Sequence, residues 1–190
     1  MPNLYIIAGC NGAGKTTASF TILPEMLNCW EFVNADEIAR GLSPFAAEGV
    51  SIEAGRIMLK RIDELIAEKK DFAFETTLAS RSFTTLIKRA EGEGYRVTLL
   101  FFWLDSVEAA IDRVTTRVSE GGHNIPKDVI QRRYHAGIKN LFELYIPICN
   151  SWVLVDNSGK FPKTIAKGYR NLNLSIFDKK IFETIHEQSK

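Results

Sequence analysis

Residues 4–17 read LYIIAGCNGAGKTT, in which a short apolar run leads into a glycine-rich segment. The apolar run suits a buried strand, and the segment after it has the spacing glycine, four residues, glycine, lysine, and serine or threonine. The residues that match this spacing are Gly9, Gly14, Lys15 and Thr16. Successive backbone N–H groups of such a loop can wrap a triphosphate, and a helix that follows turns its N-terminus toward the phosphates. The stretch therefore predicts a P-loop, or Walker A motif, between a strand and a helix.

The residue types within the loop predict how a nucleotide is held. Lys15 offers a mobile positive charge to the β- and γ-phosphates, and the hydroxyl of Thr16 is a ligand for Mg²⁺. A side chain at Gly12 or Gly14 would obstruct the approach of the phosphates. We expect Mg-ATP to be held by Gly9, Asn11, Gly12, Ala13, Gly14, Lys15, Thr16 and Thr17.

Bulk composition narrows the class of protein. The chain has 190 residues, 45% of them hydrophobic and 25% charged, which predicts a single domain over 1–190. A net charge of +1 argues against extended nucleic-acid binding and against an acidic membrane surface. The longest apolar run, 97–104, is too short to cross a bilayer. The three cysteines, odd in number and far apart, indicate a reducing compartment, so we expect a cytoplasmic protein.

Strands and helices are expected to alternate along the whole chain. The expected strands are 4–8, 31–34, 72–74, 96–104 and 152–156. The expected helices are 16–23, ended or bent by Pro24, then 51–69, 82–91, 107–118, a helix from Pro126 to Pro147, and a helical appendage at about 171–190. This alternation predicts an α/β fold, with a mostly parallel sheet covered by helices on both faces.

Acidic side chains at the carboxyl ends of the strands are the candidates for chemistry, because ligands collect at that edge of a parallel sheet. Asp36 is predicted to be the general base that accepts the proton of an attacking hydroxyl, although it could instead be a helix N-cap. Glu75 is predicted to hold the Mg²⁺ shell or to orient the acceptor; its structural alternative is an ion pair with a nearby basic residue. Thr76 is predicted to contact the acceptor, with capping of the next helix as its alternative.

A second group of candidates lies between 113 and 134, where two amphipathic segments flank Gly121 and Gly122. Helix, glycine hinge and helix with inward arginines suit a lid, predicted at about 117–133, that closes over a transferring phosphoryl group. Arg117 and Arg132 are predicted to be catalytic, although the helix phase does not decide between Arg132 and Arg133. We expect Arg113 to be a solvated surface residue. His123 is a further candidate for contact with phosphate or acceptor, and the turn 157–159 for lining the nucleobase pocket.

Four motifs together resemble the zeta-toxin-like kinases. They are GCNGAGKTT, FVNADEIARGL, FAFETTLASRS and RVSEGGHNIPKDVIQRRY, and they occur in order between residues 4 and 159. The resemblance implies a P-loop kinase fold in which Lys15 and Thr16 contact nucleotide and Mg²⁺, Asp36 is the base, and Glu75 is the strand-end acid. It implies lid roles for Arg117 and for Arg132 or Arg133. The founding toxins phosphorylate a UDP-linked amino sugar and are held inactive by an antitoxin.

The function expected from the sequence is therefore an ATP-dependent phosphotransferase that acts on a small-molecule hydroxyl, including that of a UDP-activated amino sugar, with an antitoxin-like protein as partner. Two alternatives stay open. One is a kinase for a nucleic-acid end, against which the low net charge argues. The other is a nucleotide-dependent switch that acts through a protein partner. The lid segment departs in sequence from the founding toxins, and the segment around Glu75 lacks their sugar-site pattern.

Overall fold

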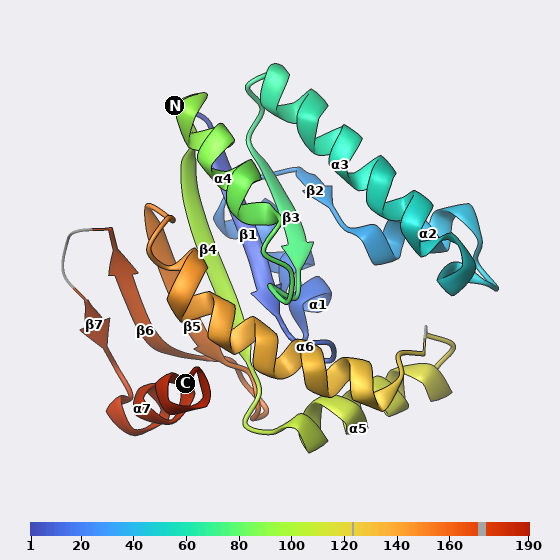
Figure 1. Ribbon diagram of the computed structural model, residues 1–190, viewed down its shortest axis with the longest axis vertical. Helices are drawn as coiled ribbons and strands as arrows, with labels where there is room; N and C mark the ends of the chain where they lie inside the picture. Colours follow the sequence, from blue (N-terminus) through green and yellow to red (C-terminus); the bar gives the residue numbers. More distant parts are fainter. Residues whose placement is uncertain (123, 171–173) are drawn as a thin grey trace.

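The computed structural model describes residues 1–122, 124–170 and 174–190. Over these ranges the chain forms one seven-stranded sheet in the order β2-β3-β1-β4-β5-β6-β7 (Figure 1). The strands are β1 (Asn3–Gly9), β2 (Glu31–Val33), β3 (Phe72–Thr76), β4 (Arg96–Trp103), β5 (Ser151–Asp156), β6 (Lys163–Tyr169) and β7 (Ser175–Ile176). The first five are parallel, and β6 and β7 extend the sheet in the antiparallel sense.

The P-loop strand lies at the centre of this sheet. β1 pairs with β3 on one side and with β4 on the other, so it is an interior strand of the sheet. Leu4, Ile6 and Ile7 are almost completely buried, as are Leu99 and Phe102 of β4. Continuous apolar strands of this kind are typical of a parallel sheet with helices on each face. The burial fixes the end of β1, and with it the loop that follows.

Helices cover both faces of the sheet, as expected from the sequence. They are α1 (Lys15–Thr21), α2 (Ala35–Leu42), α3 (Ser51–Ala67), α4 (Phe83–Gly92), α5 (Val107–Ser119), α6 (Lys127–Asn140) and α7 (Lys179–Gln188). A 3₁₀ turn covers Ala47–Val50, and π-helical turns cover Ile22–Met26 and Leu141–Tyr145. α4 and α6 cross one face of the sheet and α1 lies on the other (Figure 1), as right-handed crossovers require.

The structure refines the local expectations near both ends of the chain. Of the two effects expected of Pro24, to end or to bend the first helix, the structure rules out the first, because the chain widens after Thr21 into a π-helical turn that carries Pro24 and continues to Met26. β6 and β7 occupy residues for which no strand was expected, and the helix of the C-terminal appendage begins only at Lys179. Residues 171–173, where that helix was expected to start, lie outside the described part of the chain.

In the described ranges, no helix is both long enough and apolar enough to cross a membrane. Cys10, Cys29 and Cys149 are all buried free thiols. Burial in apolar surroundings raises the pKa of the Cys10 thiol to about 11, although the neighbouring Lys15 ammonium opposes this rise. Cys10 is therefore an uncharged residue of the loop at neutral pH.

Candidate functional site

The lysine of the P-loop is turned inward. Lys15 is 6% exposed, and its ammonium group donates a hydrogen bond to the Cys10 carbonyl at 2.9 Å. The same Nζ lies 3.5 Å from Oε1 of Glu75 at the end of β3. Within the P-loop, the Ala13 N–H also donates a hydrogen bond to the Cys10 carbonyl and closes a turn. A buried cation is thus held at the centre of the loop by one carbonyl and one carboxylate.

Glu75 also contacts the residue predicted to bind Mg²⁺. The Thr16 hydroxyl donates to Oε2 of Glu75 at 2.7 Å. The parallel pairing of β1 with β3 places Ile7 level with Glu75, so the carboxylate reaches the start of α1 across one strand spacing. The structure therefore shows the ion pair with Lys15 that was the alternative for Glu75, and it places the same carboxylate at the predicted metal ligand.

Two glycines of the loop are required by protein neighbours. A Cβ at Gly14, where φ is +79°, would lie 2.6 Å from the side-chain nitrogen of Asn157. A Cβ at Gly12, where φ is +80°, would lie 2.8 Å from the Ala110 carbonyl oxygen. The sequence predicted that phosphate approach would demand glycine at these positions. In the structure, the left-handed backbone and the close approach of α5 and of the turn after β5 already demand it.

The residue that caps α2 is Asn34. Its side-chain oxygen accepts hydrogen bonds from the backbone N–H groups of Asp36 at 2.8 Å and Glu37 at 3.3 Å. Asp36 is therefore in the first turn of the helix, and the N-cap alternative for it is wrong. Among the described residues, no group forms a hydrogen bond or an ion pair with the Asp36 carboxylate, which leaves it available to a ligand.

Two neighbouring cavities open along this edge of the sheet. The loop cavity, about 660 Å³, is lined by the P-loop, the first turn of α2 and the inner face of α5. The side cavity, about 590 Å³, is lined by α2, the segment 44–51 and the hinge after α5. The residues that line both cavities are Thr16, Asp36, Glu37, Arg40 and Arg117. Asp36 thus stands where the two cavities meet.

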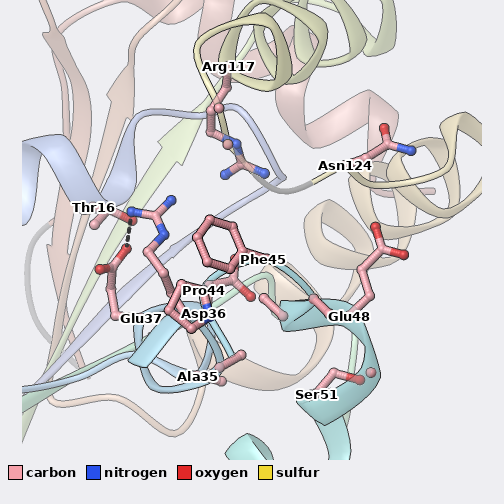
Figure 2. Close-up of a pocket in the computed structure, with 17 residues that line it drawn as sticks. Thr16, Ala35, Asp36, Glu37, Pro44, Phe45, Glu48, Ser51, Arg117 and Asn124 are labelled. Atoms are coloured by element: carbon pink, nitrogen blue, oxygen red, sulfur yellow. Dashed lines mark ion pairs between the residues drawn. The ribbon is translucent and has the colours of Figure 1, made fainter. Parts of the chain in front are cut away.

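The close-up of the side cavity shows how these groups face one another (Figure 2). Arg117 reaches in from α5, and Asp36 and Phe45 face it from α2 and the segment that follows. Phe45 is fully exposed despite being a large aromatic residue. Glu37 is held aside by an ion pair with Arg40 at 3.5 Å. The cavity therefore combines a carboxylate, a guanidinium group and an uncovered aromatic ring.

Arg113 braces the P-loop. Its Nη2 donates to the carbonyls of Asn157 at 2.8 Å and Ser158 at 3.2 Å, and the Asn157 amide donates to the Ala13 carbonyl at 2.8 Å. The expectation that Arg113 is a solvated surface residue is therefore wrong. Asn157 was expected to line a nucleobase pocket, and the structure shows it in contact with the P-loop. This contact joins residues 144 positions apart, which no local sequence pattern indicates.

The three arginines of the predicted lid differ in what they contact. Arg117 lines both cavities. In α6, Arg133 donates from Nη1 to the side-chain oxygen of Asn11 in the P-loop at 3.2 Å. Arg132, which was predicted to be catalytic, is exposed, and neither it nor Arg133 lines either cavity. Of the two arginines between which the helix phase did not decide, Arg133 is the one that points toward the P-loop. His123 lies outside the described residues.

Thr76, the last residue of β3, and Thr77 hydrogen-bond to the turn that follows the strand. The hydroxyl of Thr76 accepts from the Leu78 N–H at 3.1 Å, and that of Thr77 accepts from the Ala79 N–H at 3.4 Å. These bonds support Leu78, which has a positive φ of 57° and is fully buried. Thr76 was predicted to contact the acceptor, but its hydroxyl caps this turn and it lines neither cavity.

Two sequence comparisons relate this chain to known proteins. A family model described as Zeta toxin matches residues 1–146. A protein of Haemophilus influenzae described as uncharacterized is 31% identical over 127 residues, which is 66% of this chain and 88% of that protein.

Two solved structures show the same fold. The AvrRxo1-ORF1:-ORF2 complex with ATP matches with a TM-score of 0.79 and 16% identity, over 100% of this chain and 65% of that chain. This chain thus spans less than two thirds of that relative. The PezAT toxin–antitoxin system of Streptococcus pneumoniae matches with a TM-score of 0.64 and 13% identity, over 99% and 86% of the two chains.

Proposed function

Because the chain belongs to the zeta toxin family and has the fold of the P-loop kinases, we propose that it is an ATP-dependent kinase for a small-molecule hydroxyl. The observation that carries this proposal is the position of Asp36, on the wall shared by the loop cavity and the side cavity. Phosphoryl transfer to a hydroxyl needs a carboxylate within reach of both the donor phosphate and the acceptor. The loop cavity would hold ATP and the side cavity the acceptor.

The chemical step follows from these positions. As the acceptor oxygen bonds to the γ-phosphorus, its proton passes to the Asp36 carboxylate, and the bond from that phosphorus to the β–γ bridging oxygen breaks to release ADP. The cations that would offset the charge on the phosphates are Lys15 and Arg117, which line the loop cavity, and Arg133, which contacts the loop. Fixed guanidinium groups of this kind stabilise the charge of the transition state.

The residues at the start of α1 fit Mg²⁺. The Thr16 hydroxyl and the Glu75 carboxylate are hydrogen-bonded at 2.7 Å and supply the oxygen ligands that this ion prefers. Thr16 would bind the ion directly, and Glu75 would hold it through water. Bound Mg²⁺ would neutralise charge on the β- and γ-phosphates. Lys15, now paired with Glu75 at 3.5 Å, would be able to turn toward the same phosphates.

The resemblance to the zeta-toxin-like kinases suggests a specific acceptor and a specific kind of partner. A UDP-activated amino sugar is one acceptor that the founding toxins suggest, and the side cavity of about 590 Å³ is in the usual size range of small-molecule pockets. AvrRxo1-ORF1 and PezT are described in complexes or systems with a second protein. We propose an antitoxin-like partner for this chain as well, and the cytoplasm as the place where it acts.

Asp36→Asn tests the proposal. With labelled ATP and a metabolite extract, we expect this variant to lose transfer on the order of a hundredfold or more, because its amide accepts no proton at neutral pH. ATP affinity measured by calorimetry should change less than about threefold, since the P-loop is untouched. Glu53→Gln, which removes a carboxylate from the exposed first turn of α3, is the matched control.

The other outcomes decide against the proposal. Undiminished transfer by Asp36→Asn removes Asp36 from the mechanism. ATP hydrolysis that appears only with a protein partner, without any phosphorylated metabolite, favours a nucleotide-dependent switch instead. Transfer of label to an oligonucleotide but to no metabolite favours a nucleic-acid-end kinase.

A further inference from the structure

One buried amide side chain joins the predicted metal ligand to the helix that carries Asp36. Asn34 follows β2 and is 5% exposed. Its Nδ2 donates to Oε2 of Glu75 at 2.8 Å and to the Thr16 hydroxyl oxygen at 3.4 Å. Its Oδ1 accepts from the N–H groups at the start of α2. Sequence reasoning noted Asn34 only as a strand end; its contacts with α2 have the local spacing of an N-cap, but those with Thr16 and Glu75 cannot be read from local spacing.

The orientation of this amide is fixed by its partners. Glu75 offers only acceptor oxygens to Nδ2, and the backbone N–H groups of Asp36 and Glu37 offer only donors to Oδ1. A flipped amide would place oxygen against carboxylate and hydrogen against hydrogen. Two donors and two acceptor positions are all occupied, so the side chain has no alternative arrangement within this site. A fully satisfied buried amide of this kind makes its surroundings rigid.

We propose that Asn34 is a positioning residue that sets Asp36 relative to Thr16 and Glu75. The two hydrogen bonds from Nδ2 define where the carboxylate and hydroxyl stand, and the two bonds to Oδ1 define where α2 begins. Asp36 is two residues after Asn34, within the turn that these bonds hold. This inference rests on the proposed function, because it assigns Asn34 an effect on transfer through Asp36.

A purely structural role for Asn34 makes a different prediction. An N-cap alone needs only a side-chain oxygen, which serine provides about as well as asparagine. Asn34→Ser therefore keeps the cap of α2 but removes the amide donors to Glu75 and Thr16. Asn34→Ala removes both functions. Asp178→Ala removes the N-cap of α7, whose side chain accepts from the Ile181 N–H at 3.0 Å, and serves as the control for cap loss elsewhere.

The test compares these three variants by melting temperature, by ATP affinity across a Mg²⁺ titration, and by transfer of labelled phosphate from ATP in a metabolite extract. We expect Asn34→Ser to melt close to the wild-type temperature but to lose transfer about tenfold or more at saturating ATP. The Mg²⁺ concentration that half-saturates ATP binding should rise severalfold, because Thr16 and Glu75 keep their hydrogen bond to each other but lose the amide donor that orients both. Asn34→Ala should lose transfer to the same extent and also melt lower. Asp178→Ala should melt lower without change in either of the other measurements.

Two results would overturn the inference. Wild-type transfer and Mg²⁺ dependence in Asn34→Ser would show that the cap is all that Asn34 provides. A loss of transfer in Asp178→Ala equal to that in Asn34→Ala would show that reduced stability alone explains the effect. Asp36→Asn is measured alongside. If it transfers phosphate normally, the proposed function fails, and the Mg²⁺ titration of Asn34→Ser still decides whether Asn34 holds Thr16 and Glu75.

Discussion

At the scale of single residues, the two adjacent arginines of α6 make the sharpest prediction. Arg133→Ala should lower phosphate transfer on the order of tenfold or more, because its guanidinium group contacts Asn11 in the P-loop and is placed to offset phosphate charge. Arg132→Ala, at the exposed neighbour, should stay within about twofold of wild type. Steady-state transfer rates for the pair check this. Equal losses in both variants would contradict the assignment.

The same pair shows where sequence reasoning reaches its limit. The buried face of α6 contains Ile130, Tyr134 and Ile138. Around the helix, Arg133 lies about 100° from the centre of that face and Arg132 about 160°, so neither belongs to it and the helical period alone does not bring either one to the P-loop. The answer depends on how α6 packs against β1 and α5. Asp36 was easier to predict, because a residue just after a parallel strand must lie at the ligand-binding edge.

At the scale of elements, one change made in two helices should have opposite effects. Gly55→Ala in α3 adds a Cβ with nothing within 4 Å and should raise the free energy of unfolding by about 0.5–1 kcal/mol. Gly137→Ala in α6 adds a Cβ 2.5 Å from the backbone carbonyl oxygen of Thr77 and should lower it by roughly 1–3 kcal/mol. Urea unfolding of both variants measures the difference. A stabilising Gly137→Ala would mean that α6 does not pack closely on the turn after β3.

Elements were predictable where burial leaves a strong pattern. β4 was expected at 96–104 and found at Arg96–Trp103, because it is apolar on both faces. β6 was missed because it alternates poorly: its buried residues, Ile165, Ala166 and Gly168, include two consecutive positions and one glycine. Its pairing with β5 also carries a register shift between Leu154 and Val155. An irregular antiparallel strand near the edge of a sheet has little local signal.

At the scale of the whole molecule, buried tyrosine and cysteine side chains predict that the folded state loses stability at alkaline pH. Burial raises the pKa of Cys149 from 9.0 to about 12, and those of Tyr95 and Tyr145 from 10.0 to about 12. These groups bind protons more tightly in the folded state, so their contribution to stability is complete below pH 9 and is lost as the pH rises toward 12. The free energy of unfolding, measured with a reductant present, should fall between about pH 9 and pH 12.

A substitution isolates one part of this effect. Cys149→Ala should reduce the loss between about pH 9 and pH 10 by on the order of 1 kcal/mol, since a buried thiol no longer needs to stay protonated. Its stability at neutral pH is expected to be lower, so the comparison is between slopes. A slope that equals that of the wild type would show that the Cys149 thiol does not contribute.

The family match ends at residue 146, before β5 begins at Ser151, and this has a practical meaning for anyone who trims the chain to its matched segment. Such a fragment lacks β5, which pairs with residues Thr98 to Trp103 of β4. β4, an apolar interior strand, would become an unpaired edge strand, and exposed edge strands of this kind promote aggregation. The fragment would also lack Asn157, whose side-chain amide donates a hydrogen bond to the Ala13 carbonyl of the P-loop. We therefore expect a fragment of residues 1–146 to be insoluble and to bind ATP more weakly than the whole chain.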